Sequence, residues 1–254
     1  PLRDVRLTAT AGRVVNLAAC RHLAAVRGLT IYDRSFGDAD LTALSEAPSL
    51  GGLRSLSVGG CGNLSRGQRD GSGVSSRGVE NFAWAVVAPS LAYFHICPRL
   101  ALDRAALAAL LGDRSLPALR ALALTTCVND EGARAIAAGG AFPKLEELYL
   151  DCNAIGQGAA LALLDPVRAE RLRALHLNYN RMSEYIVDRI SAVKLPPSLR
   201  VLRLPWDALL FSGAEAIRRL EECHPLIDFG LDPQTPGVDA PVTAARVARY
   251  LLNP

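Results

Sequence analysis

The sequence lacks an apolar run of the roughly 18 residues that a membrane helix needs. It also lacks a charged opening segment followed by an apolar stretch and a cleavage site, the pattern of a secretory signal. We therefore expect a soluble, cytoplasmic protein, with secretion as an effector as the alternative. Pro1 stands where an initiator methionine would, and the repeat described below already includes Leu2, so we expect a further N-terminal portion.

Paired cysteines are also lacking. The six cysteines lie singly, with no CxxC pair, at Cys20, Cys61, Cys97, Cys127, Cys152 and Cys223. This spacing is typical of reduced thiols in a cytosol and makes disulfides the less favoured interpretation. Cys20 with His22, and Cys223 with His224, are isolated pairs without the spacing of a zinc site, so we predict no metal and no cofactor.

Lysine and aromatic residues are scarce. Only 2 of the 28 basic residues are Lys, the aromatic fraction is 6%, and the net charge of +3 is too small to indicate a nucleic-acid-binding protein. Leu and Ala are abundant instead: 41 Leu and 40 Ala make up nearly a third of the 254 residues. A core built from two aliphatic residue types favours an architecture of repeated units.

A leucine pattern recurs at a fixed period. Leu145, Leu148 and Leu150 are followed by Asn153 and Ile155, in the spacing L-x-x-L-x-L-x-x-N-x-L, and the next copy begins 27 residues later. Further copies, some weaker, begin at Leu2, Val26, Leu53, Leu91, Leu119, Leu172, Leu199 and Leu226. Nine units therefore tile the chain, and repetition at this period predicts a solenoid.

These spacings, with Asn or Cys at the ninth position, resemble the leucine-rich-repeat family and, within it, the ribonuclease-inhibitor-like class. The second halves of several units, such as residues 132–136 and 158–162, begin with Gly, are rich in Ala and predict short helices. The pattern is also similar to bacterial repeat-companion-type leucine-rich-repeat proteins. The resemblance implies an α/β solenoid of about nine repeats, a right-handed horseshoe with parallel concave strands and short convex helices, forming one domain over residues 1–254.

The ninth position of each unit has a structural interpretation. Asn153 and Asn180 can bind backbone groups that the turn leaves unpaired, while Cys61 and Cys127 are small, nearly apolar substitutes. One unit cannot bury both its strand and its helix, so stacking against neighbours supplies the core.

Two segments depart from the repeat. Residues 65–78 form an irregular insertion rich in Gly, Ser and Arg, which predicts a mobile surface loop, or alternatively an arm that folds on a partner. Residues 242–252 predict an amphipathic helix that caps the last unit.

A search for catalytic groups finds one weak candidate. Cys152 and His176 belong to adjacent units near the strand face, and Asp151 or Asn178 could orient the histidine. A hydrolase or transferase based on this pair stays as an alternative to ordinary packing of Cys152. We predict that the protein is not an enzyme.

Binding is expected on the concave face, at the residue between the second and third Leu of each unit and at the neighbouring outward positions. These positions are rich in the residue types that dominate protein interfaces. The predicted partner-binding residues are Tyr93, His95, Glu147, Tyr149, Asp151, His176, Asn178, Tyr179, Arg203 and Trp206.

We thus expect a non-enzymatic protein–protein interaction module that binds a protein partner, without nucleic acid or membrane, as the recognition part of a larger bacterial protein. The alternative is an effector or signalling adaptor whose activity lies in another domain.

Overall fold

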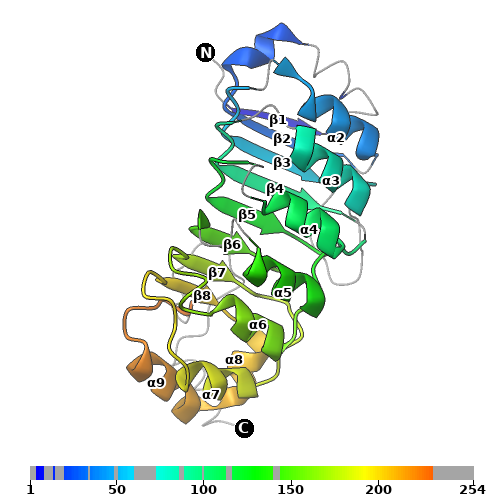
Figure 1. Cartoon of the computed structure of the whole chain (residues 1–254). Helices are drawn as coiled ribbons and strands as arrows, with labels where there is room; N and C mark the ends of the chain where they lie inside the picture. Colours follow the sequence, from blue (N-terminus) through cyan, green and yellow to red (C-terminus); the bar gives the residue numbers. More distant parts are fainter. Residues whose placement is uncertain are drawn as a thin grey trace.

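A single parallel sheet runs the length of the elongated molecule in the computed structural model of the chain (Figure 1). The structure describes residues 4–8, 14, 20–33, 35–48, 51–59, 73–85, 89–98, 100–112, 116–139 and 144–230. The described strands are β1 (Asp4–Thr8), β2 (Gly28–Tyr32), β3 (Ser55–Gly59), β4 (Tyr93–Cys97), β5 (Ala121–Leu124), β6 (Glu147–Tyr149), β7 (Ala174–His176) and β8 (Val201–Arg203). They pair in sequence order, so each strand lies beside its predecessor and its successor.

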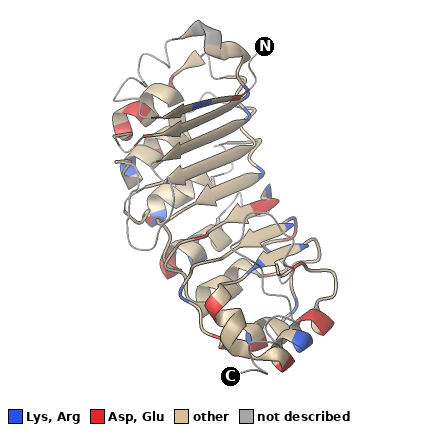
Figure 2. Cartoon of the chain, turned by 180° about the vertical axis from the view of Figure 1, so that it is seen from behind, with Lys and Arg blue, Asp and Glu red and all other residues tan. Residues whose placement is uncertain are grey.

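Short helices connect the strands. They are the 3-10 helix η1 (Arg21–Ala25) and the α-helices α2 (Asp38–Ser45), α3 (Ser76–Ala85), α4 (Arg104–Leu110), α5 (Asp130–Ala138), α6 (Gln157–Leu163), α7 (Tyr185–Ser191), α8 (Trp206–Ser212) and α9 (Ala214–Cys223). Helices α2–α6 lie on one side of the sheet (Figure 1), and the view from behind shows the strands in front of them (Figure 2). One face of the sheet is therefore packed against these helices; the described helices α2–α6 leave the other face uncovered, and we call it the open face.

The repeat period sets the register of the sheet. The residues aligned by sequence at the second leucine position lie side by side in the ladder: Val5, Leu29, Leu56, Phe94, Leu122, Leu148, Leu175 and Leu202. All but Val5 are buried. Because successive residues of a strand point to opposite faces, the residues on either side of this position point to the open face. The structure thus confirms the predicted α/β character and parallel strands.

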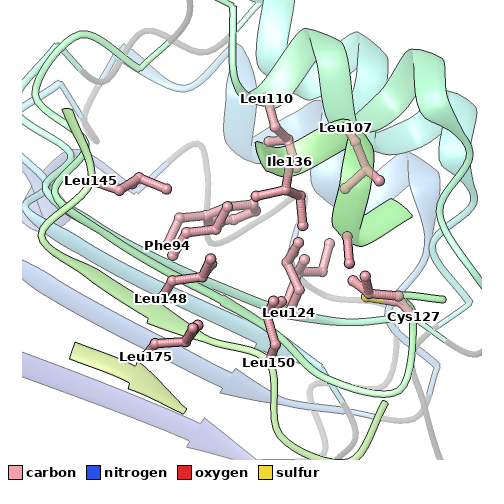
Figure 3. Packing of buried hydrophobic residues seen from close by; sticks show 14 of the residues in the cluster. Phe94, Leu107, Leu110, Leu124, Cys127, Ile136, Leu145, Leu148, Leu150 and Leu175 are labelled. Carbon is pink, nitrogen blue, oxygen red and sulfur yellow. The ribbon is translucent and has the colours of Figure 1, made fainter. Parts of the chain in front are cut away.

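The core lies between the sheet and the helices. Figure 3 shows strand residues such as Phe94, Leu124 and Leu148 converging with Leu107 and Ile136 from the helices. Helix α5 begins where the Asn129 side chain accepts a hydrogen bond from the Gly132 amide. A Cβ atom added at Gly132 would lie 3.2 Å from side-chain carbons of both Leu107 and Val128, so the small residue lets neighbouring helices approach closely.

The asparagines at the ninth position bind backbone of the preceding unit, as predicted. Asn153 accepts hydrogen bonds from the amides of Cys127 and Val128 at 2.8 and 2.7 Å, and its amide nitrogen donates to the Leu124 carbonyl at 2.7 Å. Asn180 repeats the arrangement one unit later, accepting from the Ile155 amide and donating to the Leu150 carbonyl. The two side chains therefore join successive units at the turn after each strand.

In three units, the residue before the ninth position has a left-handed backbone. The φ angles are +62° at Thr126, +58° at Cys152 and +56° at Tyr179, a conformation that residues with side chains adopt rarely. These three positions are equivalent in the repeat, so the unusual conformation recurs with the period. It turns the chain sharply and leaves the Tyr179 side chain exposed.

Several predictions need correction or lie outside the described residues. Residues 76–78, predicted as part of the loop, form the first turn of α3, where the Gly78 backbone packs against Asp38. The rest of that insertion before residue 73 and the predicted capping helix at 242–252 are not described. The ninth unit contributes an isolated bridge between Val201 and Asp228 in place of a strand.

The cysteines depart partly from the sequence-based prediction. Cys20, Cys127, Cys152 and Cys223 are free thiols, whereas Cys97 at the end of β4 is disulfide-bonded. The prediction of reduced thiols is therefore wrong for Cys97. Among the residues that the structure describes, no helix has the length and apolar character needed to cross a membrane.

Candidate functional site

The open face of the sheet presents outward side chains in rows that cross the strands. The central row runs through Arg6, Thr30, Ser57, His95, Ala123, Tyr149, His176 and Arg203, in the register that the repeat period predicts. A second row includes Tyr93, Ala121, Glu147, Ala174 and Val201. Of the ten predicted binding residues, eight fall on these rows or lie two residues after the end of β6 or β7.

Five of those residues make up one cluster, which we call the β6–β7 patch: Glu147, Tyr149, Asp151, His176 and Asn178. The Tyr149 hydroxyl donates a 2.7 Å hydrogen bond to Oε2 of Glu147 on the same strand. Its ring lies 4.5 Å from the imidazole of His176 on β7, measured between ring centroids, with the planes tilted by 39°. The patch is thus ordered by contacts within and between neighbouring strands.

Asp151 connects the two units at the far end of the patch. Its Oδ1 accepts hydrogen bonds from the Asn178 backbone amide at 2.7 Å and from the Asn178 side-chain amide at 2.9 Å. Burial raises the pKa of Asp151, although nearby His176 and these hydrogen bonds oppose the shift. Burial also lowers the pKa of His176, against the pull of Asp151, so the imidazole is neutral at neutral pH.

The pKa values of two tyrosine hydroxyls in the same region are raised, so both hydroxyls stay protonated at neutral pH. Burial, the hydrogen bond to Glu147 and the charge of Glu147 raise the pKa of Tyr149. Burial raises the pKa of Tyr93 on β4, with contributions from Tyr32 and Glu147. Both rings therefore offer a neutral phenol beside a carboxylate.

His95, also predicted as a binding residue, is held by side chains of the neighbouring units. Its Nδ1 lies 2.7 Å from the Ser57 hydroxyl on β3, and its Nε2 lies 3.3 Å from the Thr125 hydroxyl after β5. Burial lowers its pKa to about 4, so it is a neutral link across three strands. Because a hydroxyl group, and no carboxylate, is bonded to Nε2, the Ser57–His95 pair lacks the third group of a catalytic triad.

Ser57 and Thr125 are hydrogen-bond partners of His95 that the sequence-based prediction of the site did not include. The alignment of units already places Ser57 beside His95 in the central row, so the serine could have been found from the period. Thr125 lies beyond the end of its strand, and the sequence shows no signal that would have paired it with His95.

Arg203, another of the predicted binding residues, is largely buried by contacts within the chain. Its guanidinium donates to the Asp228 carbonyl and to Oδ2 of Asp228, both at 2.7 Å, and only 8% of its side chain is exposed. Gly230 packs directly over it, since an added Cβ would lie 2.8 Å from Cδ of Arg203. The sequence did not predict Asp228 as its partner, because the charge pair joins two units that align only weakly.

Tyr179 and Trp206 lie at the margin of the face. Tyr179 follows β7 in its left-handed turn with 59% of its surface exposed, next to the patch in sequence. Trp206 stands at the equivalent place after β8, but there helix α8 begins at once and replaces the turn seen in earlier units. The two residues therefore occupy equivalent positions in the repeat but lie in different local structures, a turn and the start of a helix.

Cys152 has the properties of a packing residue. Burial and the nearby charge of Asp151 raise its pKa to about 11, so the thiolate nucleophile is scarce at neutral pH. Within the described part of the chain, no hydrogen bond joins its thiol to His176, and the structure shows no group of three or more His, Cys, Asp or Glu residues able to hold a metal ion.

Comparison with known proteins supports the fold alone. No protein-family model and no curated protein matches the chain. Among solved structures, a protein from Bacteroides fragilis determined as a structural-genomics target is similar, with a TM-score of 0.54 and 16% sequence identity. The match covers 78% of this chain and 64% of that chain, so this chain spans less than two thirds of that protein.

Proposed function

We propose that this chain is a leucine-rich-repeat domain of the ribonuclease-inhibitor-like class that binds a protein partner on its open face. The 27-residue spacing, the register of its leucines and the asparagines that join successive units support the repeat class. Such repeats create extended surfaces whose outward positions are free to vary without disturbing the core.

The observation that carries the binding function is the composition of the β6–β7 patch. Tyr149, His176 and two carboxylates lie on a sheet face that the described helices leave open. Tyrosine supplies large contact area together with a polar group, which is why it is enriched at the energetic centres of interfaces. Side chains that only face solvent do not need the ordered hydrogen bonds that Tyr149 and Asp151 make, so these bonds favour a binding role.

A non-catalytic role is favoured over a Cys–His enzyme. The raised pKa of Cys152 and the neutral hydroxyl partners of His95 both disfavour nucleophilic chemistry at the two histidines of the face. In this proposal the chain itself is not catalytic, and any enzymatic activity lies in another domain or in the partner.

The disulfide at Cys97 bears on where the protein works. Disulfides persist in oxidising compartments and are rare in the cytosol. We therefore favour an oxidising compartment over the cytoplasmic location expected from the scattered cysteines.

The binding function is tested by capture from a lysate of the encoding organism, comparing the parent chain with a Tyr149→Ala/Tyr179→Ala variant. Neither tyrosine belongs to the apolar core, so both proteins should fold and can be matched by melting temperature. A protein captured by the parent and lost with the variant is the expected result. Capture that is equal for the two proteins would contradict binding through the patch.

A further inference from the structure

We propose that the partner presents a basic segment, and that an Arg or Lys side chain of that segment lies over Tyr93, Glu147 and Tyr149 on the open face. This inference rests on the proposed function, because it names the chemistry of the partner for the same surface. Three features carry it: a strand of small residues, two flanking tyrosines and an unbalanced negative charge.

Strand β5 provides the small residues. Its outward positions are Ala121 and Ala123, with Tyr93 beside the first on β4 and Glu147 and Tyr149 beside them on β6. Neighbouring strands lie about 4.8 Å apart, so the tyrosines on β4 and β6 are separated by about 10 Å of backbone. The two alanines are only 8% and 5% exposed although their methyl groups point outward, which means that the larger side chains of β4 and β6 lean over them.

The tyrosines therefore form an aromatic surface with a carboxylate at its edge. The effect of Tyr93 on the pKa of Tyr149, and of Glu147 on both tyrosines, shows that the three groups lie within electrostatic range of each other. A cation is attracted to the face of a tyrosine ring, and a guanidinium can also hydrogen-bond to a carboxylate at the same time. The Tyr149 hydroxyl, which donates to Glu147, holds the carboxylate in place for such a contact.

The charges of the face favour a basic partner. Among the outward residues of the described strands β3–β8, Arg203 is the one permanently basic side chain, and Asp228 already pairs with it. Glu147 and Asp151 are balanced by no cation on these strands, and His176 is neutral at neutral pH. The whole chain has a net charge of +3, so a basic peptide is repelled on average and needs this local negative charge to bind.

The first experiment is a titration of a fluorescent hexa-arginine peptide by anisotropy, with hexa-glutamate as the opposite probe. Glu147→Gln keeps the shape of the side chain and removes its charge, so it should weaken hexa-arginine binding about tenfold. Tyr93→Leu should weaken it several-fold by removing an aromatic face. Glu131→Gln, the same charge change on the exposed side of α5, is the matched control and should change binding less than twofold. Equal losses for Glu147→Gln and Glu131→Gln would overturn the proposal, and so would absence of hexa-arginine binding.

A selection from a random dodecapeptide display library separates failure of this inference from failure of the proposed function. Peptides that bind the parent but not the Tyr149→Ala variant should be enriched in Arg and Lys. Patch-dependent peptides that are neutral or acidic would leave the binding function standing and refute the basic partner. A library without any patch-dependent peptide would contradict both. Melting temperatures of all variants, measured alongside, show whether each is folded.

Discussion

Replacing Asn153 with Leu removes the hydrogen bonds between two units while keeping nearly the same side-chain volume. In the structure this side chain serves the amides of Cys127 and Val128 and the carbonyl of Leu124, all in a buried turn. Each buried polar group left without a partner costs about 1–3 kcal/mol. Because the turn can relax and admit water to some of these groups, we expect the free energy of unfolding to fall by about 3–6 kcal/mol.

The assay is urea unfolding followed by far-ultraviolet circular dichroism, together with the melting temperature. For a chain of this size, each kcal/mol shifts the melting temperature by about 2–4 °C, so a decrease of roughly ten degrees is expected. The control is Asn81→Leu on the exposed side of α3, the same chemical change at a solvent-facing position, which should stay within about 0.5 kcal/mol. If the two variants unfolded at the same urea concentration, the role of Asn153 in joining units would be refuted.

Two further predictions concern titrating groups. His95 has a native pKa of about 4 against an ordinary value of 6.5, so the unfolded chain binds a proton between these pH values that the native chain does not. The free energy of unfolding should therefore fall by about 2–3 kcal/mol as the pH drops from 6.5 to 4.5. Urea unfolding at the two pH values measures this fall, which should be smaller in the His95→Gln variant. An equal fall in both proteins would count against the burial of a neutral imidazole. Burial raises the pKa of Cys152 to about 11, so little reactive thiolate is present at neutral pH. At pH 7.5, iodoacetamide should label Cys152 in the native chain at least tenfold more slowly than a model thiol. Labelling as fast as the model thiol would be inconsistent with a buried thiol.

The layout of the sheet could be predicted because the same spacing is written into the sequence unit after unit. Aligning Leu148 with Leu175 and Leu202 places Tyr149, His176 and Arg203 in one row, and the structure shows this row. The roles of Asn153 and Asn180 were predictable for the same reason, since their position in the unit is fixed by the turn after the strand. Periodicity therefore determines which residues share a face and a row.

Periodicity does not determine which side chains in a row remain accessible. Arg203 occupies an outward position but is buried, because Asp228 from the irregular ninth unit reaches back to pair with it. Trp206 starts a helix where Tyr179 lies in a turn, because the unit after β8 departs from the repeat. Pairings across irregular units depend on side-chain geometry that a single repeat template does not contain.

Photo-crosslinking tests the central claim, that a partner binds the open face, most directly. Benzoylphenylalanine placed at Tyr149 on the open face is compared with the same group placed at Arg134 on the exposed side of α5. After irradiation in the encoding organism, the account predicts that the group at position 149 crosslinks one discrete protein and that the group at position 134 does not crosslink this protein. Crosslinks to the same partner from position 134, with none from position 149, would place the interface on the helices and contradict the account.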